Sequence, residues 1–237
     1  MVRAAALLAL LLSLATAGAA RAQECRLALL LALDVSSSVD AREYALQRDG
    51  LAAALNDPDI RAALLFGPGR VALSAYEWSG RQQSVVVLDW TMIASERNID
   101  AVIAGLTRSP RSQTRFPTAM GFALGFGATH LARGPACARR VIDVSGDGVT
   151  NDGFGPGLAY QHFPFEGVTV NGLAVLGADP EVDRYYDEVV RHGPGAFVEY
   201  ADGYEGFRRA MTRKLLREIG GMVVGGRARP HPEGSAG

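Results

Sequence analysis

An uninterrupted apolar run that ends in an acidic, hydroxyl-rich segment constrains the fold of this chain more than any other feature. The run is Leu27-Ala28-Leu29-Leu30-Leu31-Ala32-Leu33, and Asp34-Val35-Ser36-Ser37-Ser38 follows it directly. A run of this kind predicts a strand buried on both faces, as in a parallel sheet covered by helices. Open α/β sheets bind ligands beyond the carboxyl ends of their strands, where this acid and these hydroxyls fall. Because Mg²⁺ and Mn²⁺ prefer such hard oxygen ligands, the segment predicts a metal site.

The first 22 residues are predicted to be a signal peptide (1–22). Met1-Val2-Arg3 is a short basic start, residues 4–17 are apolar, and Ala20-Arg21-Ala22 has the small residues of a cleavage site. Cleavage changes the formal net charge from −1 to −3, because Arg3 and Arg21 are lost. No later stretch approaches the roughly 20 apolar residues of a membrane span. We therefore expect a soluble exported protein, periplasmic or secreted, with no membrane span and no binding to nucleic acid.

Apolar strands alternate with helical patterns along the rest of the chain. The expected strands are 27–33, 71–78, 84–88, 140–144, 168–175 and 196–200. The expected helices are 41–55, with Asp40 as its cap, 99–106, 118–131, 180–191 and 204–219. This order predicts an α/β fold with a doubly wound, mostly parallel six-stranded sheet flanked by helices, in the strand order 3-2-1-4-5-6. One domain spans 23–219, and the Gly-, Pro- and Arg-rich tail, 220–237, is predicted to be disordered.

Two further segments supply oxygen ligands. Thr118 opens an expected helix, and Asp147 follows the expected fourth strand in Val141-Ile142-Asp143-Val144-Ser145-Gly146-Asp147-Gly148. In the predicted strand order, strands one and four are neighbours on either side of the switch point, so the Asp34 and Asp147 loops face one crevice. Asp34 and Ser36 alone would also suit a turn or a helix cap. The three segments together predict one metal site.

The two cysteines occupy equivalent positions on these two strands. Cys25 precedes Asp34 by nine residues, and Cys137 precedes Asp147 by ten. Parallel neighbours about 4.8 Å apart with matched registers bring the cysteines together at the other end. Export permits a disulfide, which would add at most about 4–5 kcal/mol in the chain-entropy model. We expect the disulfide Cys25–Cys137; the alternative is two unpaired buried thiols, since strand parity could point the side chains apart.

The oxygen-bearing residues resemble the metal-ion-dependent adhesion site (MIDAS) of the von Willebrand factor type A (vWA) superfamily. That site reads Asp-x-Ser-x-Ser, then Thr, then Asp, and the resemblance extends over about 27–219. Its five positions are filled here by Asp34, Ser36, Ser38, Thr118 and Asp147. The resemblance implies that the three hydroxyls ligate Mg²⁺ (or Mn²⁺), while the two aspartates act directly or through water. It also implies that a partner protein's Asp or Glu carboxylate fills the open position. The expected function is thus that of a protein-binding, adhesion-type module, and not an enzyme.

Within that superfamily, three segments resemble a group of exported bacterial proteins of unknown function. They are Glu77-Trp78, residues 141–148 and Gly193-Pro194-Gly195-Ala196-Phe197. The chain departs from the group at Val149-Thr150-Asn151-Asp152 and at 160–165, where a plainer helix is expected. These departures concern the rim of the predicted site.

An enzyme is the main alternative. Gly146-Asp147-Gly148-Val149-Thr150-Asn151-Asp152 resembles the magnesium motif of haloacid-dehalogenase-type phosphatases, in which Asp34 would be the nucleophile. Those enzymes need a second acid two residues further on, where this chain has Ser36. They also need a lysine ahead of the motif, and the only lysine, Lys214, lies far behind it. The remaining alternative is a structural exported domain with a vestigial site, which would bind no metal.

Other polar residues carry weaker signals. Arg108, Arg111 and Arg115 precede Thr118 and form either a cationic rim or a solvated loop. Asp143 lies inside an apolar strand and should be hydrogen-bonded or paired if it is buried. The four histidines show no spacing typical of metal ligands.

Overall fold

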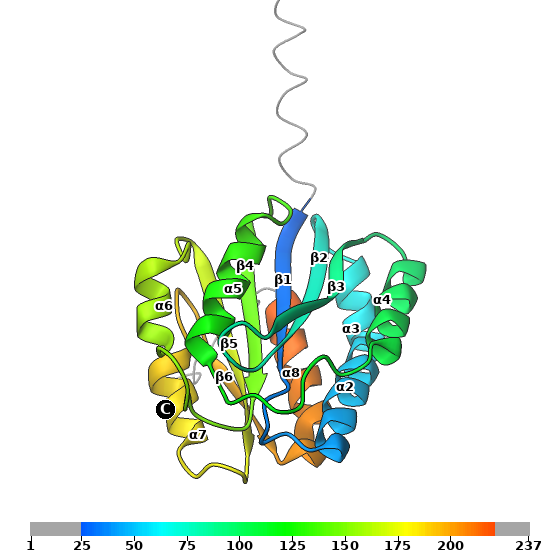
Figure 1. Cartoon of the computed structure of the whole chain (residues 1–237). Helices are drawn as coiled ribbons and strands as arrows, with labels where there is room; N and C mark the ends of the chain where they lie inside the picture. The colour runs from blue at the N-terminus through cyan, green and yellow to red at the C-terminus, as the bar shows by residue number, and fades with distance from the viewer. Residues whose placement is uncertain (1–24, 221–237) are drawn as a thin grey trace, which may run out of the picture.

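A six-stranded sheet forms the centre of the molecule (Figure 1). The computed structural model describes residues 25–220; the predicted signal peptide, 1–22, and the predicted tail after Gly220 lie outside the described residues. The strands are β1 (Cys25–Asp34), β2 (Arg70–Trp78), β3 (Ser84–Ile93), β4 (Arg139–Gly146), β5 (Val168–Leu176) and β6 (Val198–Asp202). Their order is β3-β2-β1-β4-β5-β6, and only the β2–β3 pair is antiparallel. The predicted fold class and strand order are therefore confirmed.

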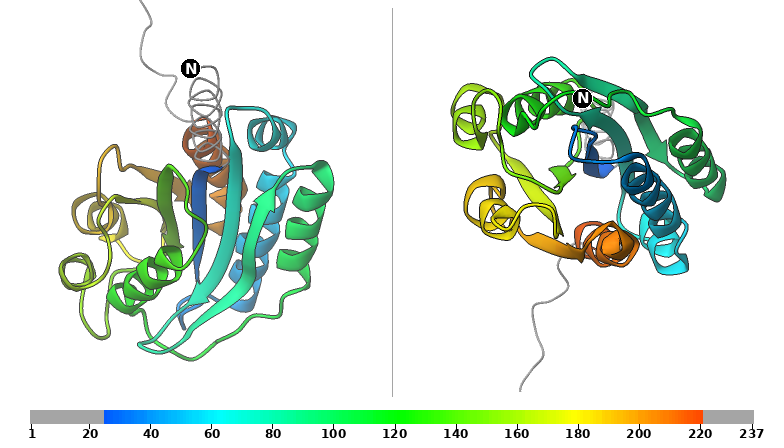
Figure 2. Two further views of the ribbon diagram at one scale, coloured as in Figure 1. Left: turned by 90° about the horizontal axis from the view of Figure 1, so that it is seen from above. Right: turned by 60° about the horizontal axis from the view of Figure 1, so that its bottom comes forward.

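Helices cover both faces of the sheet (Figures 1 and 2). One face carries α2 (Ala41–Leu55), α3 (Pro58–Leu65), α4 (Glu96–Arg108) and α8 (Phe207–Ile219). The other carries α5 (Met120–Ala132), α6 (Pro156–His162), α7 (Val182–Tyr185) and a π-helix, Tyr186–Val190. Strand β1 supplies both cores, because Leu27, Leu29, Leu31 and Leu33 face the α2–α8 side while Ala28, Leu30 and Ala32 face α5. Its unbroken apolar run follows from burial on both faces.

Helix α2 begins immediately after the Asp34 segment, and its start is fixed by a capping box. The Asp40 side chain accepts a hydrogen bond from the backbone N–H of Glu43, and the Glu43 carboxylate accepts one from the backbone N–H of Asp40. Two orphan N–H groups of the helix end are thereby satisfied. The predicted cap is confirmed, and it fixes where the chain turns from the Asp34 loop into the helix.

Several element boundaries differ from the sequence prediction. Helices α3 and α6 were not predicted; both are short and begin at a proline in the first turn. The third strand extends to Ile93, beyond the predicted end at residue 88. It is an edge strand, and its partly exposed residues interrupt the apolar run on which the prediction depended. Thr118 precedes α5 and is not part of it. The expected helix 180–191 is a single α-turn followed by the π-helix, and the last helix starts at Phe207 after a 3-10 turn, Tyr204–Gly206.

The amino-terminal ends of β1 and β4 are joined by a disulfide. The register pairs Leu27 with Arg139, which places Cys25 opposite Cys137. The two Cα atoms are 4.6 Å apart, and the structure contains the Cys25–Cys137 bond. The predicted pairing is confirmed.

A buried ion cluster lies between the sheet and α8. The Lys214 Nζ atom is 2.6 Å from Asp143 Oδ1 and 2.7 Å from Glu218 Oε1. Asn171 Nδ2 donates a hydrogen bond of 2.8 Å to the same Glu218 oxygen. All three charged side chains are at most 1% exposed. Asp143 is thus paired, as expected for an acid in an apolar strand, and Lys214 lies inside this cluster.

Candidate metal centre

The Asp34 loop is built from the end of β1 and held by its neighbours. Asp34 is fully buried, and its Oδ1 atom accepts a hydrogen bond of 2.7 Å from the backbone N–H of Ser36. The Asp34 carbonyl accepts a hydrogen bond of 2.8 Å from Gln47 Nε2 on α2. The backbone N–H of Val35 donates to the Trp78 carbonyl at the end of β2. The loop is therefore fixed from three elements before any ligand is considered.

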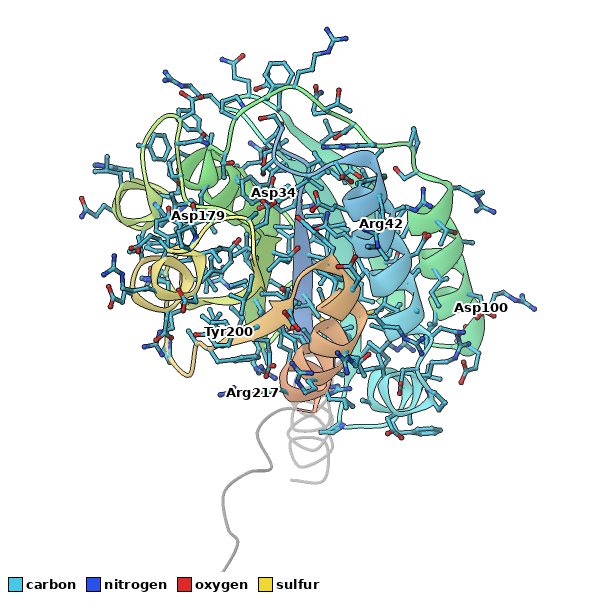
Figure 3. The ribbon with its side chains drawn as sticks, turned by 90° about the horizontal axis from the view of Figure 1, so that it is seen from below. Asp34, Arg42, Asp100, Asp179, Tyr200 and Arg217 are labelled. Carbon is cyan, nitrogen blue, oxygen red and sulfur yellow. A yellow bond between two sulfur atoms is a disulfide. The ribbon has the colours of Figure 1, made fainter. Side chains whose placement is uncertain are left out.

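The structure brings the five predicted site residues together at the carboxyl end of the sheet, the end seen in Figure 3. Hydroxyl oxygens connect the three segments: Ser36 Oγ lies 3.1 Å from Ser38 Oγ, and Thr118 Oγ1 lies 3.3 Å from Ser36 Oγ. Ser38 Oγ donates a hydrogen bond of 2.9 Å to Asp147 Oδ1. Ser36, Thr118, Asp34 and Asp147 are buried, whereas Ser38 is exposed. The cluster is therefore accessible from solvent on the Ser38 side.

The two aspartates lack the partners that buried carboxylates need. Among residues 25–220, neither Asp34 Oδ2 nor Asp147 Oδ2 has a hydrogen-bond partner. Burial, and then the nearby Asp147 charge, raise the pKa of Asp34 to about 7. Burial raises the pKa of Asp147 as well, and the charge of Asp179 adds to this effect. Both carboxylates would be stabilised by a cation, so the residues present fit a divalent metal ion.

The candidate ligands include more hydroxyl groups than carboxylates, so the site does not depend on a cluster of three or more acidic, His or Cys side chains. No group of three or more His, Cys, Asp or Glu side chains in residues 25–220 could hold a metal ion. The cluster has two carboxylates and three hydroxyls, Asp34, Asp147, Ser36, Ser38 and Thr118. Two carboxylates balance the charge of a divalent cation, and the hydroxyl oxygens complete a hard-ligand set suited to Mg²⁺ or Mn²⁺.

Thr118 is held by the segment 149–152, one of the two places where the sequence was expected to depart from the related group. Its backbone N–H donates a hydrogen bond of 2.9 Å to Asn151 Oδ1, and its carbonyl accepts from the backbone N–H groups of Asn151 and Asp152. The side chain of Asp152 in turn pairs with Arg81 across the rim. The sequence analysis names Asn151 within two segments but does not predict this contact, because a loop Asn gives no signal of which backbone group it will bind.

Arg111 binds the backbone of the Asp34 loop. Its Nη2 atom donates to the carbonyls of Val35, Ser36 and Val39 at 3.0, 3.1 and 2.8 Å. Its guanidinium carbon also lies 5.5 Å from the centre of the Tyr44 ring. One arginine nitrogen therefore binds three carbonyls of the loop. Arg108 and Arg115 are exposed, so only Arg111 departs from the expectation of a rim or a solvated loop.

Glu77 anchors the segment that carries Arg111. Its Oε1 atom accepts a hydrogen bond of 2.7 Å from the Tyr44 hydroxyl, and its Oε2 atom accepts one of 2.6 Å from the backbone N–H of Ser112. Trp78, next along β2, is fully buried in the core on the α5 side. Glu77 and Trp78, one of the segments that resemble the family of unknown function, thus support the site and its packing.

The buried hydroxyls of Tyr186 and Tyr204 lie close enough to Asp34 and Asp147 to be affected by their charges. A Cβ atom on Gly146 would lie 2.7 Å from both Asp34 Oδ2 and the Tyr186 hydroxyl, so these two oxygens border the same point. The hydroxyls of Tyr186 and Tyr204 have no hydrogen-bond partner in residues 25–220. Burial, and then the aspartate charges, raise the pKa of both tyrosines. Nothing in the local sequence indicates this contact, because Tyr186 reaches the site from the irregular π-helix.

Solved structures with the same fold include a von Willebrand factor type A protein, a matrix protein and a pilus adhesin. Proximal thread matrix protein 1 from the mussel byssus, with a zinc-occupied MIDAS motif, matches with a TM-score of 0.61 and 15% identity over 84% of this chain and 48% of that one. A von Willebrand factor type A protein from Catenulispora acidiphila matches with a TM-score of 0.61 and 15% identity, covering 83% and 43%. The pilus adhesin SpaC from Lactobacillus rhamnosus GG matches with a TM-score of 0.60 and 16% identity, covering 83% and 31%.

The chain thus has a vWA fold and spans less than half the length of these three proteins. A search of curated proteins finds no match. The family model for "Protein of unknown function (DUF1194)" matches residues 24–223, and the chain belongs to that family. The predicted resemblance to a family of unknown function is confirmed by the family model, and the predicted vWA fold is confirmed by the solved structures. None of the helices in residues 25–220 has the length and hydropathy needed to cross a bilayer.

Proposed function

We propose that this protein is an exported, metal-dependent protein-binding module. Mg²⁺ or Mn²⁺ would be held by Ser36, Ser38 and Thr118, together with Asp34 and Asp147 acting directly or through water. When bound, the cation would supply an open coordination position for an Asp or Glu carboxylate of a partner protein. We further propose that residues 1–22 are a signal peptide and that the mature protein is periplasmic or secreted.

One observation carries this proposal. Two fully buried carboxylates each have an oxygen without a partner among the described residues, and three hydroxyl oxygens lie beside them. Burying two acids together without a cation is unfavourable, as the raised pKa values of both show. A divalent cation would remove that cost, and the exposed Ser38 side of the cluster would admit it from solvent.

The solved relatives support the same interpretation. One was determined with zinc in its MIDAS motif, and another is a pilus adhesin. The phosphatase alternative lacks its lysine, because Lys214 is buried against Asp143 and Glu218 and not at the Asp147 loop. The chain's own residues at the site would therefore bind and orient a cation, with no general acid at the Ser36 position.

The first experiment is a thermal melt of the protein titrated with Mg²⁺ and with Mn²⁺. Binding to the native state alone stabilises it by roughly 2.7 kcal/mol at a hundredfold excess over Kd. We expect the melting temperature to rise in the wild type and to stay constant in Asp34→Ala and Asp147→Ala. Ser37→Ala is the matched control, since Ser37 is exposed and lies between two proposed ligands.

Two outcomes would contradict parts of the proposal. A flat response of the wild type to both metals would indicate a vestigial site, and a metal response that persists in Asp34→Ala would place the ion elsewhere. If the metal binds, a pull-down from the host envelope with and without chelator tests for a carboxylate-bearing partner. Sequencing the amino terminus of the exported protein tests the signal peptide, with Gln23 as the expected first residue.

A further inference from the structure

A pocket of about 350 Å³ lies at the opposite end of the sheet from the candidate metal centre. It is lined by Arg139, Thr169, Asn171, Pro194, Gly195, Phe197 and Arg217. Arg139 is the first residue of β4, whereas Asp147 follows its last residue, so these two residues are roughly 26 Å apart along the strand. Figure 3 labels Arg217 on α8, apart from Asp34. The pocket is therefore a separate site.

Two arginines give this pocket a positive charge. No salt bridge joins Arg139 or Arg217 to a carboxylate within residues 25–220. The nearby acids Asp143 and Glu218 are buried and paired with Lys214. Guanidinium groups that have no acidic partner and line one cavity are suited to bind carboxylate or phosphate oxygens.

Both guanidinium groups are positioned by the protein. Arg139 Nη1 donates a hydrogen bond of 3.0 Å to the Glu218 carbonyl, which leaves its other N–H groups available. The guanidinium carbon of Arg217 lies 3.8 Å from the centre of the Phe197 ring. Stacking of this kind fixes the plane of the guanidinium group while its N–H edges remain free to donate. The two groups are thus partly preorganised for an anion.

The remaining walls are rigid and leave space. Asn171 is 2% exposed; its Nδ2 atom donates to Glu218, and its Oδ1 atom accepts from the backbone N–H of Phe197 at 3.0 Å. Gly195 has a φ of +71°, and a Cβ atom there would meet nothing within 4 Å. The Gly193-Pro194-Gly195-Ala196-Phe197 segment, which has no contact with the metal centre, therefore forms an open wall of this pocket. Its volume is at the lower end of the roughly 300–1,000 Å³ of small-molecule sites.

We propose that this pocket binds a small-molecule oxyanion, a carboxylate or phosphate group, through Arg139 and Arg217. The proposal is independent of the metal centre. The anion would contact α8 directly through Arg217 and the β4 edge through Arg139. The Gly195 wall would lie beside the rest of the ligand.

Titration by ¹H–¹⁵N nuclear magnetic resonance tests this site, with inorganic phosphate as one probe and succinate as the other at constant ionic strength. We expect saturable shifts of the Gly195 and Phe197 amides. The tighter of the two probes would assign the ligand to phosphates or to carboxylates. R217Q should weaken binding by roughly tenfold or more, the effect of removing a charged hydrogen-bond donor.

The side chain of Arg217 makes no hydrogen bond within residues 25–220 and contacts the Phe197 ring, so R217Q should fold, and an unchanged melting temperature would show this. R139Q should weaken binding likewise. R209Q is the control of equal charge, since Arg209 is exposed on the same helix outside the pocket. Shifts that do not saturate with either probe, or an equal loss of affinity in R209Q and R217Q, would overturn the proposal.

Discussion

Two groups of buried acids lie along β4, and the protein treats them differently: Asp143 in the strand is paired with Glu218 of α8, and Asp147 after the strand lies near Asp34 of β1. Asp143 and Glu218 share the ammonium group of Lys214 at 2.6 and 2.7 Å. Asp34 and Asp147 contact only hydroxyls and backbone, and the nearest cation, Arg111, lowers the pKa of Asp34 less than burial raises it. A buried carboxylate needs a counter-charge. The first acid pair thus receives its counter-charge from a side chain, whereas under the proposed function a bound metal ion would supply the counter-charge of the second pair.

The largest expected effect comes from removing the encoded cation. Lys214→Met keeps much of the side-chain volume but leaves Asp143 and Glu218 buried without a counter-charge. Breaking a buried pair in this way costs about 3–5 kcal/mol. Urea denaturation at pH 7 measures the loss. The neighbouring Arg213→Met removes an exposed pair with Glu199 and should cost less than about 1 kcal/mol; equal losses would contradict the comparison.

Removing an acid from the metal centre should have the opposite sign. Because the folded pKa of Asp34 is about 7, above the ordinary 3.8, the metal-free protein gains stability as the pH falls from 8 towards 4. Asp34→Asn removes this dependence, and at pH 8 it should stabilise the metal-free protein by at most roughly 4 kcal/mol. Unfolding free energies at pH 5 and pH 8 with chelator measure the difference.

The raised pKa of Asp143, caused by burial and by Glu218, acts in the same direction in both proteins. Its contribution therefore cancels when wild type and Asp34→Asn are compared. If the unfolding free energies of the two proteins change equally with pH, Asp34 does not have the raised pKa on which this prediction depends.

Glycine substitutions sharpen the comparison within the Asp147 loop. Gly146→Ala places a Cβ atom 2.7 Å from Asp34 Oδ2 and from the Tyr186 hydroxyl, which is closer than real contacts allow. We expect a loss of about 1–3 kcal/mol together with weaker metal binding, as for other overpacked sites. Gly148→Ala is the control, since nothing lies within 4 Å of its added Cβ. Calorimetry with and without Mg²⁺ measures both, and equal effects would argue against the close approach.

The smallest expected changes in stability come from removing the hydroxyl groups of two buried tyrosines, and these changes should differ. Tyr44→Phe removes the hydrogen bond to Glu77 and leaves that carboxylate oxygen unpaired, so it should destabilise the protein by about 1–2 kcal/mol. Tyr186→Phe removes a hydroxyl that has no partner in residues 25–220, so it should be neutral or stabilise the metal-free protein by up to about 1 kcal/mol. Chemical denaturation with chelator compares them. Similar losses in both would indicate that the Tyr186 hydroxyl has a partner.

The centre of the fold could be predicted from the sequence because it depends on local patterns. The apolar run of β1 and the acid that follows it fixed the switch point, and the matched spacing of Cys25 and Cys137 predicted their bond. The five candidate ligands follow strands or precede a helix, so topology alone brings them together. Their metal-binding role remains a proposal.

The supports of the site could not be predicted in the same way. Arg111 and Asn151 act on backbone groups far away in the sequence, and any loop arginine or asparagine has the same local appearance. The edge strand β3 and the π-helix were misjudged because exposure and tertiary packing, rather than periodicity, set their extent. Long-range contacts of single side chains leave no pattern in one sequence.

The Cys25–Cys137 bond also determines how the domain would bear mechanical tension. The chain enters β1 at Cys25, at the end of the sheet opposite the Asp34 loop (Figure 1). A pull between the segment preceding Cys25 and a partner held at Asp34 would run along β1. The disulfide would transfer part of that load to Cys137, just before the first pair of residues that joins β1 to β4. Both central strands would then be loaded in shear. Unzipping β1 alone would then be prevented until the disulfide is reduced.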